Sequence, residues 1–202
     1  MDCWDERYRA GEHRDDPPSP RLVQAVALLP PGRALDLACG PGRNALWLAA
    51  AGWRVTAVDR SGVALAMLRE RALRLGLEVD TRQADLERGE LPIPPDSFDL
   101  ICDFHYLQSD LFPEIRAGVR PGGLAVAAIH LVDATPGLRP MNRDYLLEPG
   151  ELRNEFPGWD ILHYSEGAPP GRRAVAEIVA RRRRRSGESV ETAAGCRYLG
   201  DS

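Results

Sequence analysis

Acidic residues and glycines near the start of the chain have the types and spacing of a nucleoside-binding site. Residues 33–44 read RALDLACGPGRN, an apolar segment that contains Asp36 and leads into a turn with Gly40 and Gly42. Glycines allow a turn tight enough for a ligand to lie against the backbone, and the helix that follows offers free N–H groups. Asp59 ends the next apolar segment, 17 residues beyond Gly42, where a carboxylate is placed to bind ribose hydroxyls. We therefore predict a site for a nucleoside cofactor.

Apolar segments that alternate with helical segments must position these residues. Strands that alternate with helices imply right-handed crossovers and a mostly parallel, doubly wound seven-stranded sheet of the α/β class. Only nine Gly- and Pro-rich residues separate the last two strands, which is too short for a crossover helix, so the last strand should run antiparallel. The expected strands are 34–38, 54–59, 78–83, 98–104, 124–130, 160–164 and 174–180. The expected helices are 20–29, 43–51, 62–75, 111–118 and 149–156.

The composition indicates one soluble domain of ordinary charge. The 202 residues are 44% hydrophobic with a formal net charge of −4, so we expect no general affinity for nucleic acid. We expect a terminal arm or lid at 1–18, the domain at 19–180 and a disordered, arginine-rich tail at 181–202, in which the run Arg181–Arg185 is solvated. Four scattered cysteines argue against disulfides and a metal site. The charged N-terminus and the lack of a long apolar run predict a cytoplasmic protein that does not enter a membrane.

Two kinds of nucleoside cofactor fit the glycine turn. Residues 40–45, GPGRNA, match the dinucleotide pattern Gly-x-Gly-x-x-Gly/Ala, so nicotinamide or flavin chemistry has to be considered. Asp36, directly before the turn, would repel a pyrophosphate but attract the positively charged amino group of a methionine moiety. Asp85 follows the third expected strand, where a carboxylate can accept hydrogen bonds from an adenine amino group. With the antiparallel last strand, these acids favour S-adenosylmethionine.

Several segments, in order, make the chain similar to a class I S-adenosylmethionine-dependent methyltransferase. They are LDLACGPG at 35–42, VD at 58–59, ADL at 84–86, FDLICD at 98–103 and RPGG at 120–123. Within that class, GRNALWLA at 42–49 and the N-terminal Trp/Tyr segment resemble the tellurite-resistance subgroup, whereas Ala38 stands where the class often has a glycine. The resemblance implies that the cofactor contacts Asp36, Ala38, Gly40, Gly42, Arg43 and Asn44 with its methionine part, Asp59 with its ribose, Arg60, Asp85 and Leu86 with its adenine, and also Asp103.

The acceptor should lie at the carboxyl ends of the fourth and fifth strands, beside the cofactor crevice. We predict His105 and Tyr106 as catalytic residues, with His105 as the candidate general base, and His130, Trp4 and Tyr8 as substrate contacts. Each of these side chains could instead simply pack under the cofactor or on the core. A soft acceptor such as a thiol needs no base. The end of the sixth strand, with His163, Tyr164 and Glu166, is a candidate rim of the pocket.

The predicted function is S-adenosylmethionine-dependent methyl transfer to a small molecule. The reaction is an in-line displacement, so the protein has to align and desolvate the acceptor. Two alternatives stay open: an NAD(P)-dependent oxidoreductase, and a non-catalytic module that binds S-adenosylmethionine. The acceptor and the oligomeric state are not predicted.

Overall fold

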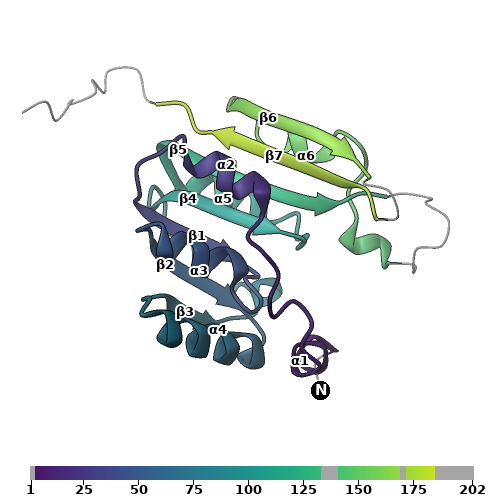
Figure 1. Ribbon diagram of the computed structural model, residues 1–202. Helices are drawn as coiled ribbons and strands as arrows, with labels where there is room; N and C mark the ends of the chain where they lie inside the picture. The colour runs from purple at the N-terminus through teal and green to yellow at the C-terminus, as the bar shows by residue number, and fades with distance from the viewer. Residues whose placement is uncertain (1–2, 133–140, 169–171, 185–202) are drawn as a thin grey trace, which may run out of the picture.

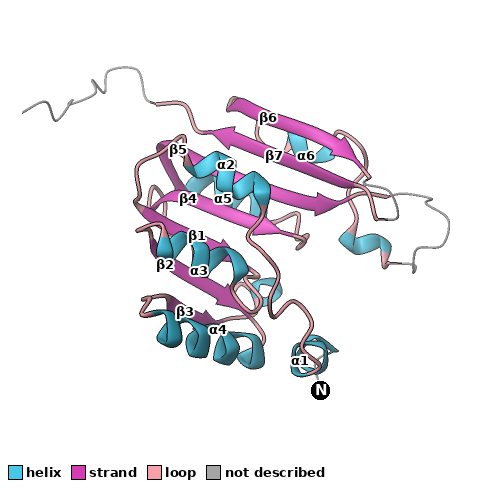
Figure 2. Cartoon of the chain, in the orientation of Figure 1, coloured by secondary structure: helices cyan, strands magenta, loops and turns pink. Residues whose placement is uncertain are grey.

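The computed structural model describes residues 3–132, 141–168 and 172–184, and it shows a seven-stranded sheet between two layers of helices (Figures 1 and 2). The strand order is β3-β2-β1-β4-β5-β7-β6; strands β1 to β5 are parallel, whereas β7 is antiparallel to both of its neighbours. The predicted fold class is therefore confirmed. The strands are β1 (Arg33–Leu37), β2 (Arg54–Asp59), β3 (Asp80–Gln83), β4 (Phe98–Phe104), β5 (Val119–His130), β6 (Asp160–Gly167) and β7 (Val175–Arg181).

Each helix layer buries its own apolar cluster against one face of the sheet. Helices α2, α3 and α4 cover one face through side chains such as Leu22, Leu48 and Leu65, and α5 and α6 cover the other through Phe112 and Leu152 (Figure 1). A sheet covered on both faces needs nearly continuous apolar strands, as β4 and β5 have. The helices are α1 (Cys3–Arg9), α2 (Pro20–Val26), α3 (Arg43–Ala50), α4 (Gly62–Leu75), α5 (Leu111–Gly118) and α6 (Glu151–Asn154), with 3-10 turns η1 (Leu86–Arg88) and η2 (Arg143–Tyr145).

The last strand lies between β5 and β6 and not at the sheet edge. Its pairing with β5 runs from Leu124↔Arg181 to His130↔Val175. Strand β5 is longer than predicted, because it begins at Val119 and includes the RPGG segment, where the register with β4 shifts. The insertion of β7 brings its side chains next to the carboxyl end of β5, where the acceptor is predicted to lie.

The arginines after β7 are partly built into the domain. The tail is predicted from sequence to begin at residue 181, yet β7 includes Arg181. Arg182 donates to the carboxylate of Asp96 at 2.6 Å and to the backbone carbonyls of Arg116, Ala117 and Val119 at the end of α5. Carbonyls at a helix C-terminus carry partial negative charge, so a guanidinium is favourable there. Residues 185–202 lie outside the described part.

No helix within the described ranges is both long enough and apolar enough to span a membrane.

Candidate cofactor and acceptor site

A cavity of about 1240 Å³ opens at the carboxyl ends of the parallel strands and brings together side chains from segments far apart in sequence. Of the predicted site residues, Gly42 and Asp103 do not line it. The predicted residues that do are Trp4, Tyr8, Asp36, Ala38, Gly40, Arg43, Asn44, Asp59, Arg60, Asp85, Leu86, His105, Tyr106 and His130.

The glycine turn is held in place by Asp59 at the end of β2. The buried Asp59 carboxylate accepts the backbone N–H of Gly40 at 2.7 Å and that of Ser61 at 2.8 Å. These charged hydrogen bonds fasten the turn after β1 to the start of α4. Ala38 has a φ of +46°, in the left-handed region that favours glycine, so the backbone is strained at the position where the chain departs from the class pattern.

Gly42 allows close packing and does not face the cavity. Its φ is +83°, and a Cβ at this position would lie 2.2 Å from Leu68 of α4. Glycine therefore lets α3 begin against α4. In the first turn of α3, the buried side chain of Asn44 accepts the backbone N–H of Ser19 at 2.9 Å, which anchors the start of α2 beside the glycine turn.

Asp36 is a buried acid that lines the cavity with one oxygen unsatisfied. The residue is 1% exposed, the Cys102 thiol donates to Oδ1 at 3.7 Å, and Oδ2 has no hydrogen-bond partner in the described structure. Burial raises the pKa of Asp36 to about 7, although the Cys102 thiol, the Arg43 guanidinium and the N–H of Ala45 oppose the rise. A buried carboxyl group in this state would gain from a cationic ligand group.

Asp103 lies on the opposite face of the sheet from Asp36. Its register partners are Leu37 and Ala127, which belong to the apolar cluster under α5. Burial, and then the charge of Asp36, raises the pKa of Asp103 well above its usual range, and the group accepts the backbone N–H of Tyr106. Asp103 therefore stabilises the turn after β4 and does not line the cavity.

The predicted adenine end is organised around the turn η1. The Asp85 carboxylate caps this turn by accepting the N–H of Glu87 at 3.1 Å. The carbonyl of Leu86 accepts the side-chain amide of Gln108 at 3.2 Å, and the Tyr106 hydroxyl donates to Gln108 at 2.7 Å. Burial raises the pKa of Tyr106, so its hydroxyl stays a donor. Gln108, which no sequence motif marks, thus connects η1 to the predicted catalytic turn.

Helix α1 lies beside α4 (Figure 1), and its residues Trp4, Arg7 and Tyr8 line the cavity. The Trp4 and Tyr8 rings stack with centroids 5.6 Å apart, and a Cβ on Gly40 would lie 3.1 Å from the Tyr8 hydroxyl. The Ser61 hydroxyl donates to Asp5 at 2.5 Å, which ties α1 to the start of α4. The aromatic pair, predicted to contact substrate, therefore lies against the glycine turn.

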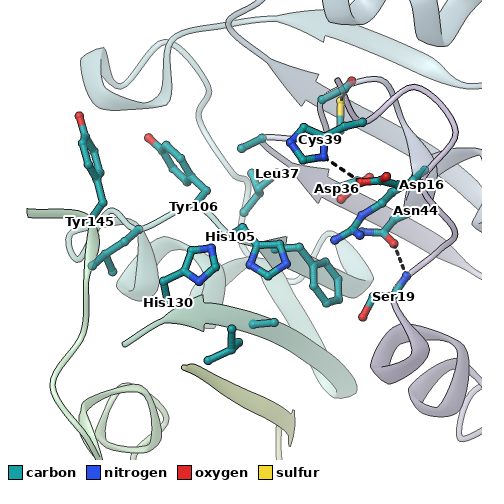
Figure 3. A pocket seen from close by; sticks show the side chains of 18 of the residues that line it. Asp16, Ser19, Asp36, Leu37, Cys39, Asn44, His105, Tyr106, His130 and Tyr145 are labelled. Atoms are coloured by element: carbon teal, nitrogen blue, oxygen red, sulfur yellow. Dashed lines mark hydrogen bonds and ion pairs between the residues drawn. The ribbon is translucent and has the colours of Figure 1, made fainter. Parts of the chain in front are cut away.

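Two histidines stack at the other end of the cavity. His105 follows β4 and His130 ends β5; their ring centroids are 4.7 Å apart with an interplanar angle of 25° (Figure 3). His105 has a φ of +65°, and its backbone N–H donates to the carbonyl of Ala128 at 2.7 Å. Desolvation by burial, and then the positive charges of His130 and Arg43, lower the pKa of His105 to about 4. His105 is thus neutral at pH 7 and a weaker base than an ordinary histidine.

Strands β6 and β7 supply a wall that sequence reasoning largely missed. Of the residues predicted for the rim, Glu166 lines the cavity, whereas His163 and Tyr164 do not. Glu177 of β7 also lines it, and a single acid in an apolar strand gives no signal of that role. In the described ranges, no group of three or more His, Cys, Asp or Glu side chains is arranged to hold a metal ion.

The chain is similar in sequence to several known proteins. Residues 34–123 match a family model described as a methyltransferase domain. Hemagglutinin 1 of Eikenella corrodens is 35% identical over 151 residues, which cover 72% of this chain and 49% of that protein. The probable S-adenosyl-L-methionine-dependent methyltransferase TehB of Haemophilus influenzae is 27% identical over 173 residues, covering 81% and 58%. The trans-aconitate 2-methyltransferase of Paracidovorax citrulli is 33% identical over 133 residues, covering 62% and 48%.

The crystal structure of TehB from Haemophilus influenzae has the same fold. It matches with a TM-score of 0.73 at 22% sequence identity, over 89% of this chain and 67% of that chain. The chain spans about half the length of the curated relatives it matches. Residues 34–123 therefore carry a methyltransferase domain, and the chain resembles class I S-adenosylmethionine-dependent methyltransferases such as TehB, whose cofactor is S-adenosyl-L-methionine.

Proposed function

We propose that this protein transfers the methyl group of S-adenosylmethionine to a small molecule. The observation that carries the proposal is the cavity of about 1240 Å³, which is lined by Asp85 at one end and by His130 at the other. Sites for one small ligand measure roughly 300–1,000 Å³, so this cavity has room for a cofactor and a small acceptor together. The relative that is named for trans-aconitate, a small molecule, supports this choice.

The cofactor is proposed to lie along the glycine turn, with an acid for each of its polar parts. The unsatisfied oxygen of Asp36 fits the amino group of the methionine part. Asp59, which already holds Gly40, fits the ribose hydroxyls, and Asp85 fits the adenine amino group. When bound, the cofactor supplies a methyl group already activated on a sulfonium.

The histidine pair is proposed to align the acceptor. A neutral imidazole with a pKa of about 4 can hydrogen-bond to an acceptor, but it holds almost no proton at pH 7. The contribution of His105 is therefore orientation of the acceptor for in-line attack rather than strong general-base catalysis. His130, stacked on it, limits the positions that the His105 ring can take.

Calorimetric titration with S-adenosylhomocysteine and with NADH tests the cofactor site. We expect S-adenosylhomocysteine to bind the wild type, and Asp59→Ala to weaken its binding at least tenfold, because charged hydrogen bonds contribute roughly 1.5–3 kcal/mol. Glu114→Gln, which changes an exposed acid on α5, is the matched control and should bind as the wild type does. Tighter binding of NADH than of S-adenosylhomocysteine would instead support the oxidoreductase.

Turnover on a panel of thiols, hydroxylated metabolites, small amines and oxyanions tests the reaction itself. We expect S-adenosylhomocysteine to form with at least one acceptor, and His105→Ala to lower kcat/KM while cofactor affinity stays unchanged. Cofactor binding without turnover on any member of the panel would support the non-catalytic module.

A further inference from the structure

Adjacent positions of three strands form one face of the cavity at its acceptor end. Register partners on neighbouring strands, and residues two apart on one strand, project from the same face of a sheet. His130 and Glu177 have the two large polar side chains of this face, and the other members are small. The members are Ala128 and His130 on β5, Glu177 and Val175 on β7, and Ser165 and Gly167 on β6, all of which line the cavity.

Glu177 is held in one orientation by Arg21 of α2. The Nε and Nη2 atoms of Arg21 donate to the Oε2 atom of Glu177 at 3.1 Å and 3.0 Å. The Oε1 atom accepts no hydrogen bond from another described residue, and the Glu177 side chain is 31% exposed. A carboxylate oxygen accepts up to two hydrogen bonds, so a fixed acceptor group is left for a ligand.

Glu177 is one strand away from the histidine pair. Its register partner Ala128 is the residue whose carbonyl holds the N–H of His105, and His130 lies two residues further on β5. Neighbouring strands are separated by about 4.8 Å, so a molecule of a few heavy atoms that contacts the imidazoles reaches the carboxylate. The acceptor end therefore presents a carboxylate beside two imidazoles.

We propose that Glu177 binds the acceptor, and that this end of the cavity selects small molecules with an ammonium or another hydrogen-bond-donating group near the methyl-accepting atom. The inference rests on the proposed function above. Arg172 and Arg173 also line the cavity, from the segment before β7, and they favour the opposite charge. Arg172 is exposed, so solvent screens its charge more than it screens that of the half-buried Glu177. Arg173 is half-buried, as Glu177 is, and it already interacts with another group.

Three thiols of nearly equal size and different charge test the selection. The probes are 2-mercaptoethylamine, 2-mercaptoethanol and 3-mercaptopropionate, titrated by NMR into protein saturated with S-adenosylhomocysteine. We expect the ammonium probe to bind about tenfold more tightly than the carboxylate probe. Glu177→Gln should remove this preference, Arg21→Gln should increase it by removing the countercharge, and the control Glu114→Gln should leave it unchanged.

Equal binding of the three probes, including binding of none, would overturn the proposal. A preference for 3-mercaptopropionate would overturn it too, because the arginines would then dominate. Affinity for S-adenosylhomocysteine, measured for each variant, shows whether the variant is folded. Methyl transfer to these thiols is followed separately by mass spectrometry of the S-methyl product. A charge preference without turnover of any acceptor would contradict the proposed function and leave Glu177 as a binding residue. Turnover without a charge preference would contradict the role of Glu177 and leave the proposed function standing.

Discussion

Replacing Asp36 with asparagine is expected to stabilise the cofactor-free protein relative to the wild type as the pH rises. The pKa of Asp36 is raised from 3.8 to about 7 by burial. Between these values the folded state keeps a proton that the unfolded chain has lost. The contribution of Asp36 to stability is therefore full below the unfolded pKa and is lost as the pH rises through the folded one.

The magnitude follows from the size of this shift. Between pH 5 and the folded pKa of about 7, the folded protein holds a proton at Asp36 that the unfolded chain lacks. Each pH unit in this range lowers the free energy of unfolding of the wild type by about 1.4 kcal/mol, so the loss by pH 8 is roughly 3 kcal/mol. Asparagine carries no charge and avoids this loss. Its amide places a buried donor at the position of the unsatisfied Oδ2 atom, which costs about 1–3 kcal/mol at either pH. The variant should thus be the less stable protein at pH 5 and should gain about 3 kcal/mol on the wild type by pH 8.

Urea unfolding at pH 5, 6.5 and 8 measures this change, with Glu114→Gln as the control that should follow the wild type. Saturating S-adenosylmethionine should reverse the advantage at pH 8, because its cationic amino group is proposed to stabilise the charged carboxylate. A free-energy difference between Asp36→Asn and wild type that stays constant from pH 5 to pH 8 would refute the reasoning. It would mean that Asp36 is already satisfied as an anion without cofactor.

Three further predictions concern stability. Arg182→Ala should lower the free energy of unfolding in urea by about 2–3 kcal/mol, because it removes the charged hydrogen bond to Asp96 and the contacts at the end of α5. The control Arg183→Ala, at an exposed arginine, should cost less than about 0.5 kcal/mol. Equal effects of the two substitutions would contradict the assignment of Arg182 to the domain. Gly42→Ala should destabilise the protein by roughly 2–4 kcal/mol, because a φ of +83° strains an alanine and its Cβ would lie 2.2 Å from the buried Leu68 side chain. S-adenosylhomocysteine binding should weaken as the start of α3 shifts; a variant with normal stability and normal affinity would contradict this. Because the pKa of His105 is lowered to about 4, its contribution to stability is full above about pH 6.5 and is lost as the pH falls to about 4. Water in the cavity limits this loss to about 1 kcal/mol. His105→Gln should therefore show a smaller fall in Tm between pH 6.5 and pH 4 than the wild type shows.

Local features of the sequence are sufficient to predict that the glycine turn and its acids lie at one end of the cavity. The glycine turn follows from residues that allow positive φ, and β1 and β2 follow from short apolar runs that end in or contain an acid. The carboxyl ends of parallel strands meet at one edge, so the α/β alternation predicts that Asp36, Asp59 and Asp85 lie together, and all three line the cavity. These inferences need only turn chemistry, hydrophobic periodicity and the handedness of crossovers.

Contacts between distant segments decided the rest, because they depend on register and on the order of strands. The alternation of side chains along β4 turns Asp103 away from the cavity, although it is adjacent to Cys102, whose thiol contacts Asp36. The cavity walls lower the pKa of His105, which no sequence motif encodes. The insertion of β7 beside β5 places Glu177 in the cavity wall, opposite Ala128 and one strand away from His130. The sequence by itself thus determined the fold class and the glycine turn through local backbone preferences. The end of the cavity around His105 and Glu177 was decided only by tertiary packing, because strand order and burial depend on the free energy of the whole sheet.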